Sequence, residues 1–126
     1  MYKRQGKIYV PEFGHVLLGL GDEYVRGVSY NDMYPADVEP WEENLTTLVD
    51  FERKAWHGMI EKGTPIPTPV DENQPRRLGV YEGGGYVDKG VYRPWPNCMM
   101  NNLHTIDVFC PVCTAAIQKQ IDFLCR

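Results

Sequence analysis

The chain lacks any long hydrophobic run, and it contains no cluster of basic residues. None of its apolar stretches approaches the roughly 18 residues that a membrane-spanning helix requires. Its 13 basic and 17 acidic residues give a net charge of −4, so neither nucleic acid nor an acidic membrane surface is an expected partner. The first ten residues have a basic start but no apolar stretch after it, so we expect no signal peptide. These deficits exclude a membrane protein and a nucleic-acid-binding protein.

The composition of the chain is that of one globular domain. A chain of 126 residues can bury about two-thirds of its unfolded surface, which is enough for a core. Aromatic residues make up 12% of the chain and argue against disorder, whereas 12 glycines and 10 prolines predict many loops. The sequence shows neither an internal repeat nor a domain boundary. We therefore interpret residues 1–126 as a single domain.

Local patterns predict three helices and a few short strands. Residues 7–10 favour a strand, and residues 11–18 favour a short helix with Pro11 at its first position and glycines after it. The aperiodic stretch over residues 24–40 predicts an ordered loop. Apolar residues at helical spacing predict a second helix over residues 48–61, and a third helix should begin at Pro111.

Prolines and glycines dominate the region between the second and third helices. Residues 64–77 contain four prolines, which exclude a helix or an inner strand and favour extended, exposed backbone. Residues 78–81 favour a strand, and residues 82–86 (EGGGY) favour a turn. Together these patterns predict an α+β fold that is mostly helical and rich in loops.

The four cysteines all lie in the last third of the chain, at Cys98, Cys110, Cys113 and Cys125. A Cys-x2-Cys pair flanked by two further cysteines is compatible with a structural zinc site made of thiolates. One or two disulfides in an oxidising compartment fit the same spacing, and so do buried free thiols. The spacing alone leaves all three states open.

A glutamate and a histidine near the N-terminus have the spacing of a zinc-peptidase helix. In such helices two histidines one turn apart bind zinc, and the glutamate after the first acts as general base. Glu12 and His15 keep the positions of the glutamate and the second histidine, but Pro11, which has no donor atom, stands at the first histidine's position. By itself this pattern is weak, because His15 also fits a core position and Glu12 a helix N-terminus.

Four longer segments make the pattern specific: EFGHVLLGLGDEY, WHGMIEKGTPIPTP, YEGGGYVDKGVYRPWPNCMM and FCPVC. Together and in this order they resemble the bacterial immunoglobulin-A peptidase family of metzincin-like zinc metallopeptidases. That family has H-E-F-G-H followed by G-L-x-D-E-Y, then a tryptophan helix leading into G-T-P-x-P-T-P. The resemblance extends from about Ile8 to Ile117, which is nearly the whole chain.

The resemblance implies a set of zinc-site residues. It makes Glu12 the catalytic general base, His15 the second zinc ligand and Asp22 the third ligand, with Glu23 as the alternative to Asp22. The structural alternative for Asp22 is a cap on the turn after Gly21.

Further residues are assigned by the same resemblance. Met100, or else Met99, matches the methionine of the turn that underlies a metzincin zinc site. Tyr86 or Tyr92 would stabilise an oxyanion. Cys98, Cys110 and Cys113 belong to the family's cysteine segments and are expected to be structural. His57 and His104 match no motif, so solvated or packing roles are expected for both.

The resemblance also implies a metzincin-like lower subdomain, zinc as the cofactor, a protein or peptide substrate, and a secreted or cell-surface location. Two departures bear on activity. Pro11 removes one of three zinc ligands, which should weaken zinc binding about a hundredfold. Only ten residues precede the motif, so most of the N-terminal wall of the cleft is expected to be absent.

The expected function is therefore that of a zinc metallopeptidase-like domain for peptide-bond hydrolysis with impaired or no activity. The alternatives are a non-catalytic pseudopeptidase that binds protein through the old cleft, and a structural module whose only metal lies among the cysteines. A face that packs on the missing wall would be exposed, so self-association is expected as well.

Overall fold

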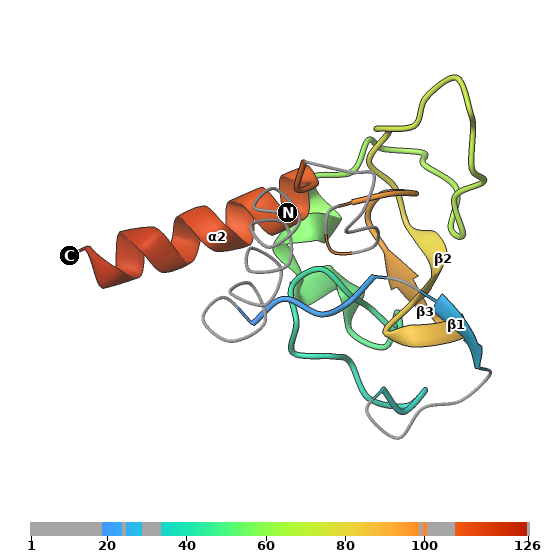
Figure 1. Ribbon diagram of the computed structural model, residues 1–126, viewed down its shortest axis with the longest axis horizontal. Helices are drawn as coiled ribbons and strands as arrows, with labels where there is room; N and C mark the ends of the chain where they lie inside the picture. The colour runs from blue at the N-terminus through green and yellow to red at the C-terminus, as the bar shows by residue number, and fades with distance from the viewer. Residues whose placement is uncertain (1–18, 24, 29–33, 99, 101–107, 126) are drawn as a thin grey trace, which may run out of the picture.

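The computed structural model describes residues 19–23, 25–28, 34–98, 100 and 108–125. A small three-stranded sheet and one α-helix form the framework of this part of the chain (Figure 1). The strands are β1 (Val25–Val28), β2 (Tyr81–Gly84) and β3 (Tyr86–Arg93), in the order β1-β3-β2. β1 runs parallel to β3, whereas β2 and β3 form an antiparallel hairpin. This content agrees with the predicted α+β class.

The described part is loop-rich, as predicted, but the expectation that it is mostly helical is wrong. Two short 3-10 turns, η1 (Phe51–Arg53) and η2 (Ala55–Gly58), replace the helix predicted over residues 48–61. Lys54 between them is extended, with φ −75° and ψ 138°, and its ammonium group donates to the carbonyl oxygens of Pro40, at 2.6 Å, and Glu42. The apolar spacing still places Phe51 and Trp56 in the core. Burial of a lysine head group thus interrupts the helical pattern.

The strand predictions are displaced rather than absent. The loop predicted over residues 24–40 contains β1, and β2 begins at the end of the strand predicted over residues 78–81. The turn predicted over residues 82–86 is confined to Gly85, which has φ +54° and separates β2 from β3. The preceding glycine, Gly84, allows the Leu45 side chain to pack closely against β2, because a Cβ at residue 84 would lie 2.9 Å from Leu45.

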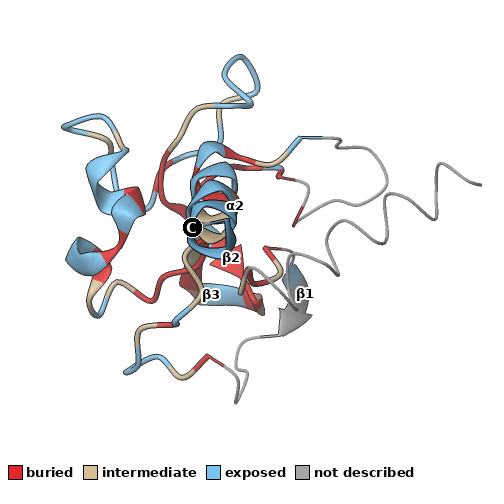
Figure 2. Cartoon of the chain, turned by 90° about the vertical axis from the view of Figure 1, so that its left-hand side faces the viewer, coloured by how far each residue is buried: buried red, intermediate tan, exposed pale blue. Residues whose placement is uncertain are grey.

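The α-helix α2 (Pro111–Leu124) begins where the sequence predicted. Cys110 is its N-cap, with Sγ accepting the backbone N–H of Cys113 at 3.4 Å, and Pro111 occupies the first turn. Only the start of α2 is buried, and the rest of the helix projects away from the sheet and is largely exposed (Figures 1 and 2).

The core has a larger and a smaller cluster. The larger one joins the start of α2, the two 3-10 turns and the segment after β3: Leu20, Phe51, Trp56, Val80, Trp95, Cys98, Met100, Cys110, Val112 and Cys113. The smaller one lies against the sheet and contains Tyr34, Leu45, Val87 and Val91. The proline-rich residues 64–77 are extended and largely exposed, as predicted, and Thr68 ties them to Val80 through a pair of 2.8 Å hydrogen bonds.

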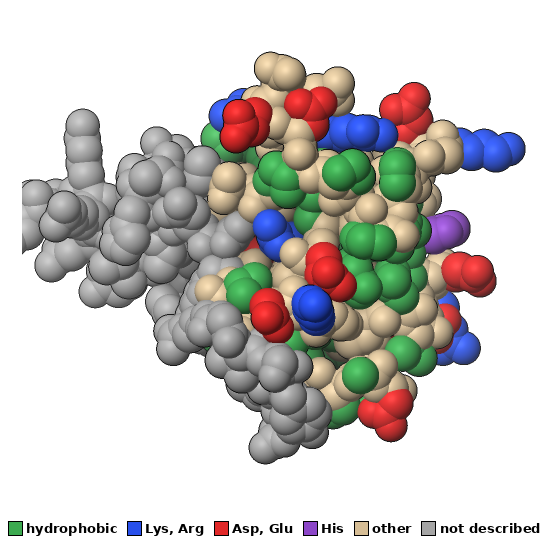
Figure 3. Space-filling model, turned by 90° about the vertical axis from the view of Figure 1, so that its right-hand side faces the viewer, with side chains coloured by type: hydrophobic (Ala, Val, Ile, Leu, Met, Phe, Trp, Pro, Cys, Tyr) green, Lys and Arg blue, Asp and Glu red, His purple; other side chains and the backbone are tan. Residues whose placement is uncertain are grey.

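Some predicted elements lie outside the described residues, namely the strand over residues 7–10 and the helix over residues 11–18 with Glu12 and His15. Met99 and His104 also lie outside them. Among the helices that are described, none is long and apolar enough to cross a membrane. On the face shown in Figure 3, acidic and basic side chains are interspersed with apolar ones.

Candidate functional site

Three segments that are far apart in sequence meet at residues 22 and 23. The backbone N–H of Glu23 donates to the carbonyl oxygen of Met100 at 2.9 Å. The backbone N–H of Gly85 donates to the carbonyl oxygen of Asp22 at 2.8 Å. The register of the sheet continues this pairing, because Val25 of β1 lies opposite Tyr86 of β3. The segment before β1 is therefore held between the β2–β3 turn and residue 100.

The Asp22 carboxylate is half-buried and accepts a hydrogen bond from the Tyr86 hydroxyl group at its Oδ2 atom. Tyr86 has φ 73°, a left-handed conformation that is rare for residues other than glycine. A residue keeps such a conformation only where its surroundings enforce it, and such residues cluster at functional sites. The fold thus fixes the orientation of Asp22 through a tyrosine at an unusual backbone position.

Tyr92 lies elsewhere on the hairpin. Its hydroxyl group donates to Glu82 Oε2 at 3.5 Å on the exposed surface, and burial and the Glu82 charge both raise the pKa of Tyr92. Of the two tyrosines that the sequence offered for an oxyanion, Tyr86 is therefore the one in contact with Asp22. The oxyanion role itself remains a prediction.

Glu23 has the opposite environment to its neighbour, since its side chain is 0% exposed. Asn44 donates to Glu23 Oε1 at 3.0 Å and also bonds both the N–H and the carbonyl oxygen of Gly21, each at 2.8 Å. Glu23 Oε2 has no hydrogen-bond partner among the described residues. Burial raises the pKa of Glu23 well above its usual value, and the negative charge of Cys98 acts in the same direction.

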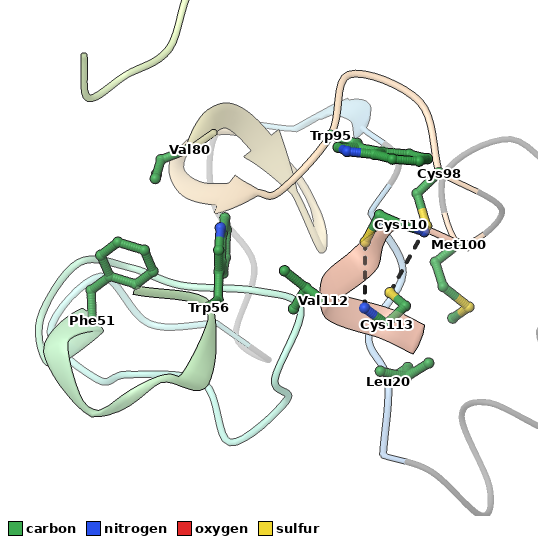
Figure 4. Close-up of a cluster of buried hydrophobic side chains, with 10 residues drawn as sticks. All are labelled: Leu20, Phe51, Trp56, Val80, Trp95, Cys98, Met100, Cys110, Val112 and Cys113. Atoms are coloured by element: carbon green, nitrogen blue, oxygen red, sulfur yellow. Dashed lines mark hydrogen bonds between the residues drawn. The ribbon is translucent and has the colours of Figure 1, made fainter. Parts of the chain in front are cut away.

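Three cysteines surround the Glu23 carboxylate (Figure 4 shows the sulfur atoms at the start of α2). Cys113 Sγ lies 3.3 Å and Cys110 Sγ 4.0 Å from Glu23 Oε1, and the Cys98 and Cys113 sulfurs are 3.9 Å apart. One ligand atom from each of the four residues lies within 4.8 Å of every other. All four cysteines of the chain are described and none forms a disulfide; Cys125 is exposed at the far end of α2. We call Glu23, Cys98, Cys110 and Cys113 the thiol cluster.

The three sulfurs of the thiol cluster are unequal acids. Hydrogen bonds from Cys110 and Cys113 lower the pKa of Cys98, and the backbone N–H of Cys110 donates to its sulfur at 3.1 Å. Burial raises the pKa values of Cys110 and Cys113. Hydrogen bonding thus favours ionisation of Cys98, whereas burial disfavours ionisation of Cys110 and Cys113.

The structure brings together most of the predicted site residues that it describes. Glu23 and the three cysteines are adjacent, Asp22 precedes Glu23 in the same segment, and Met100, which is 1% exposed, belongs to the core cluster that contains the cysteines. The sequence offered Glu23 only as the alternative zinc ligand to Asp22 and did not predict its position beside the cysteines, because nothing near it in the chain marks it as their neighbour.

For His57 the sequence predicts a solvated or packing role. His57 is exposed, and its ring meets that of Phe51 edge-on with a centroid distance of 5.2 Å. It lines a hollow of about 400 Å³ beside η1 that contains none of the predicted site residues. This hollow is therefore separate from the candidate site.

Comparison with known proteins adds the family. The family described as IgA Peptidase M64 matches residues 2–78 and 70–121, and so covers nearly the whole chain. A comparison with curated proteins finds no match. The family match agrees with the motifs that run from Glu12 to the cysteine pair at the start of α2. This chain belongs to the IgA peptidase M64 family.

Proposed function

We propose that this chain is a zinc metallopeptidase-like domain with a metzincin-like lower subdomain, and that its capacity for peptide-bond hydrolysis is impaired by Pro11. Membership of the family implies a metallopeptidase-like domain and a protein or peptide substrate. The observation that carries the proposal is the pairing of the Asp22 carboxylate with the Tyr86 hydroxyl group. Metal-binding carboxylates are held by such outer donors, which fix their orientation.

In this proposal His15 and Asp22 hold zinc, and Glu12 accepts a proton from the attacking water. A bound zinc ion would supply activation of that water. The half-buried Asp22 carboxylate suits a catalytic zinc site, which has three protein ligands and an open position. Pro11 offers no atom to the metal, so the set is one ligand short. The proposal therefore assigns this chain a weakened metal site rather than a complete one.

The position of Met100 supports the metzincin-like part of the proposal. Its side chain is buried, and its carbonyl oxygen accepts the N–H of Glu23, next to the proposed ligand Asp22. A methionine that underlies the metal-binding segment is what the resemblance implies. The proposal includes a secreted or cell-surface location, as is typical of such peptidases.

Self-association is a further part of the proposal. Exposed apolar side chains at the end of α2, namely Ile121, Phe123 and Leu124, support it. Sizing chromatography coupled to light scattering tests it, and a monodisperse monomer at all concentrations would contradict it.

The proposed catalytic site can be tested by supplying its missing ligand. We expect Pro11→His to raise zinc affinity at this site about a hundredfold, whereas the matched control Pro11→Ala removes the proline without adding a ligand. Zinc content by mass spectrometry and cleavage of a mixed library of fluorogenic peptides are measured for both variants. Glu12→Gln in the Pro11→His background should keep the added zinc and lose any cleavage.

The outcomes separate the proposal from its alternatives. Added zinc together with Glu12-dependent cleavage supports an impaired peptidase. Added zinc without cleavage favours the non-catalytic pseudopeptidase. That alternative rests on the presence of Pro11 at the position of the first zinc ligand. If Pro11→His and Pro11→Ala hold the same amount of zinc, then His15 and Asp22 do not form a metal site, and the proposal is wrong.

A further inference from the structure

We propose that the thiol cluster is a second, structural metal site, in which Glu23, Cys98, Cys110 and Cys113 bind one zinc ion. This inference does not rest on the proposed peptidase function, because it uses none of Pro11, Glu12, His15 or Asp22. It rests on the geometry of the four side chains, on an unpartnered carboxylate oxygen and on the donors that surround the ligands.

Three distances within the cluster are close to the edges of a zinc tetrahedron. Zinc–sulfur bonds of about 2.3 Å and zinc–oxygen bonds of about 2.0 Å place two sulfurs about 3.8 Å apart, and a sulfur and an oxygen about 3.5 Å apart. The cluster has 3.9 Å between the Cys98 and Cys113 sulfurs and 3.3 Å between Cys113 Sγ and Glu23 Oε1. Cys110 Sγ lies 4.0 Å from the same oxygen. The ligand atoms therefore need only small shifts to enclose an ion.

The buried carboxylate is the second, independent observation. Glu23 is fully buried, yet its Oε2 atom has no hydrogen-bond partner among the described residues. An unpartnered buried carboxyl oxygen is costly, and proteins keep such groups where they are paired or coordinate a metal. A zinc ion bound by the carboxylate would compensate its burial. Protons leaving the thiol and carboxyl groups for solvent would balance the charge of the incoming ion.

Hydrogen-bond donors hold the ligand atoms of the cluster, as they do in metal sites. Asn44 holds Glu23 Oε1, the Cys110 N–H group donates to Cys98 Sγ, and the Cys113 N–H group donates to Cys110 Sγ. Such outer hydrogen bonds fix the ligands and stabilise their negative charge. All four ligands are buried, so no position is open to a substrate. A closed set of four ligands is typical of a structural site.

The donor set selects the class of metal. Three sulfurs and one carboxylate suit zinc, whereas calcium and magnesium prefer sites made of oxygen.

Zinc binding by the full chain tests the proposal. The protein is reduced, stripped of metal with a chelator and titrated with Zn²⁺ alone in competition with a chromophoric chelator. We expect one zinc ion per chain to bind tightly at the thiol cluster, apart from weaker binding at the proposed His15 and Asp22 site. Cys113→Ser and Cys110→Ser should each weaken binding about a hundredfold. Cys125→Ser is the matched control, because it changes an exposed cysteine of the same helix, and it should leave the affinity unchanged.

Two Glu23 variants keep the test decisive if a serine variant does not fold. Glu23→Gln keeps the shape of the side chain but removes its charge, and should weaken zinc binding. Glu23→Cys completes a four-cysteine site and should bind zinc at least as tightly as the natural chain. Equal weakening by both variants would contradict the proposal, because a buried glutamate with a purely structural role predicts that result.

Cobalt provides a spectroscopic readout that activity cannot supply. Co²⁺ in the thiol cluster should give thiolate-to-metal charge-transfer bands and the ligand-field bands of a tetrahedral ion. Asp22→Asn should leave these bands intact, which separates this site from the proposed catalytic one. The inference is wrong if the natural chain binds no zinc, if cobalt gives no thiolate bands, or if Cys113→Ser and Cys125→Ser bind zinc equally well.

Discussion

Asp22 and Glu23 are neighbours in the chain, yet their carboxylates lie in opposite surroundings. Asp22 is half-buried and contacts the hydroxyl group of a tyrosine at the β2–β3 turn. Glu23 is fully buried and contacts Asn44 and the thiols at the start of α2. One backbone segment, held by residues 85 and 100, therefore places its two carboxylates in chemically different environments.

The difference separates the two proposals. Catalytic metal sites keep an open position for water and substrate, whereas structural sites are closed by protein ligands. We call the Asp22 side the open side and the thiol cluster the closed side, after the catalytic and structural sites proposed for them. Under these proposals Pro11 removes a ligand from the open side only, so this chain would lose its reaction and still keep a metal-stabilised scaffold.

Removal of zinc should have the largest effect on stability, because it acts on the closed side. With free zinc at a thousand times its dissociation constant, binding stabilises the folded chain by about 4 kcal/mol. Thermal unfolding followed by circular dichroism should therefore show a fall in Tm of several degrees when a chelator is added. Asp22→Asn should show the same fall.

The cysteine variants decide whether this effect belongs to the thiol cluster. Cys113→Ser should have a Tm that no longer responds to the chelator, and Cys125→Ser should respond like the natural chain. A response to the chelator that survives in Cys113→Ser would place the stabilising metal elsewhere.

Asn44→Leu should have the next largest effect, and it should disturb both sides. The substitution removes the bonds to Gly21 N, Gly21 O and Glu23 Oε1, and each buried group left without a partner costs about 1–3 kcal/mol. We expect a total loss of about 3 kcal/mol in urea unfolding and a 10–100-fold loss of zinc affinity. Asn97→Leu is the control, because Asn97 is exposed. Equal stability of the two variants would show that Asn44 does not join the two sides.

The part of the fold that could be predicted is the part set by local chemistry. The start of α2 follows from the N-cap and the proline after it, which act within one helical turn. The helix predicted over residues 48–61 does not form, because the ammonium group of Lys54 donates to the carbonyl groups of Pro40 and Glu42. Spacing records which residues are apolar, but it does not record such distant partners.

In the candidate site, too, the sequence predicted the residues with a local motif but not the contacts between distant segments. The motif EFGHVLLGLGDEY drew attention to Asp22 and Glu23 together, and Cys98, Cys110 and Cys113 were expected to be structural. In the zinc interpretation of the cysteine spacing, which the sequence left open, Cys125 would be the fourth ligand, but the structure places Glu23 beside the other three cysteines instead. Contacts with distant residues, among them the bonds from Glu23 N to Met100 O and from Asn44 to Glu23 Oε1, hold that carboxylate beside the sulfurs. A contact between distant segments has no local signal.

Tyr86→Phe should have a smaller effect on stability, confined to the open side. It removes one hydrogen bond from a half-buried carboxylate, which is worth about 1–2 kcal/mol. In the Pro11→His background it should lower zinc affinity at the Asp22 site by 10–100-fold, because an outer donor to a ligand is lost. Zinc titration measures this loss. Cobalt bands of the thiol cluster should stay unchanged, and their loss would mean that the two sites are not separate.

Tyr92→Phe should have the smallest effect and completes the comparison as a matched control. Both tyrosines lie on β3 and both donate to a carboxylate, but the Tyr92 bond to Glu82 is long, at 3.5 Å, and exposed. Exposed substitutions of this kind change stability by less than about 0.5 kcal/mol. In the Pro11→His background, zinc affinity should match that of the parent. If Tyr92→Phe weakened zinc as much as Tyr86→Phe, proximity to Asp22 could not be what gives Tyr86 its role.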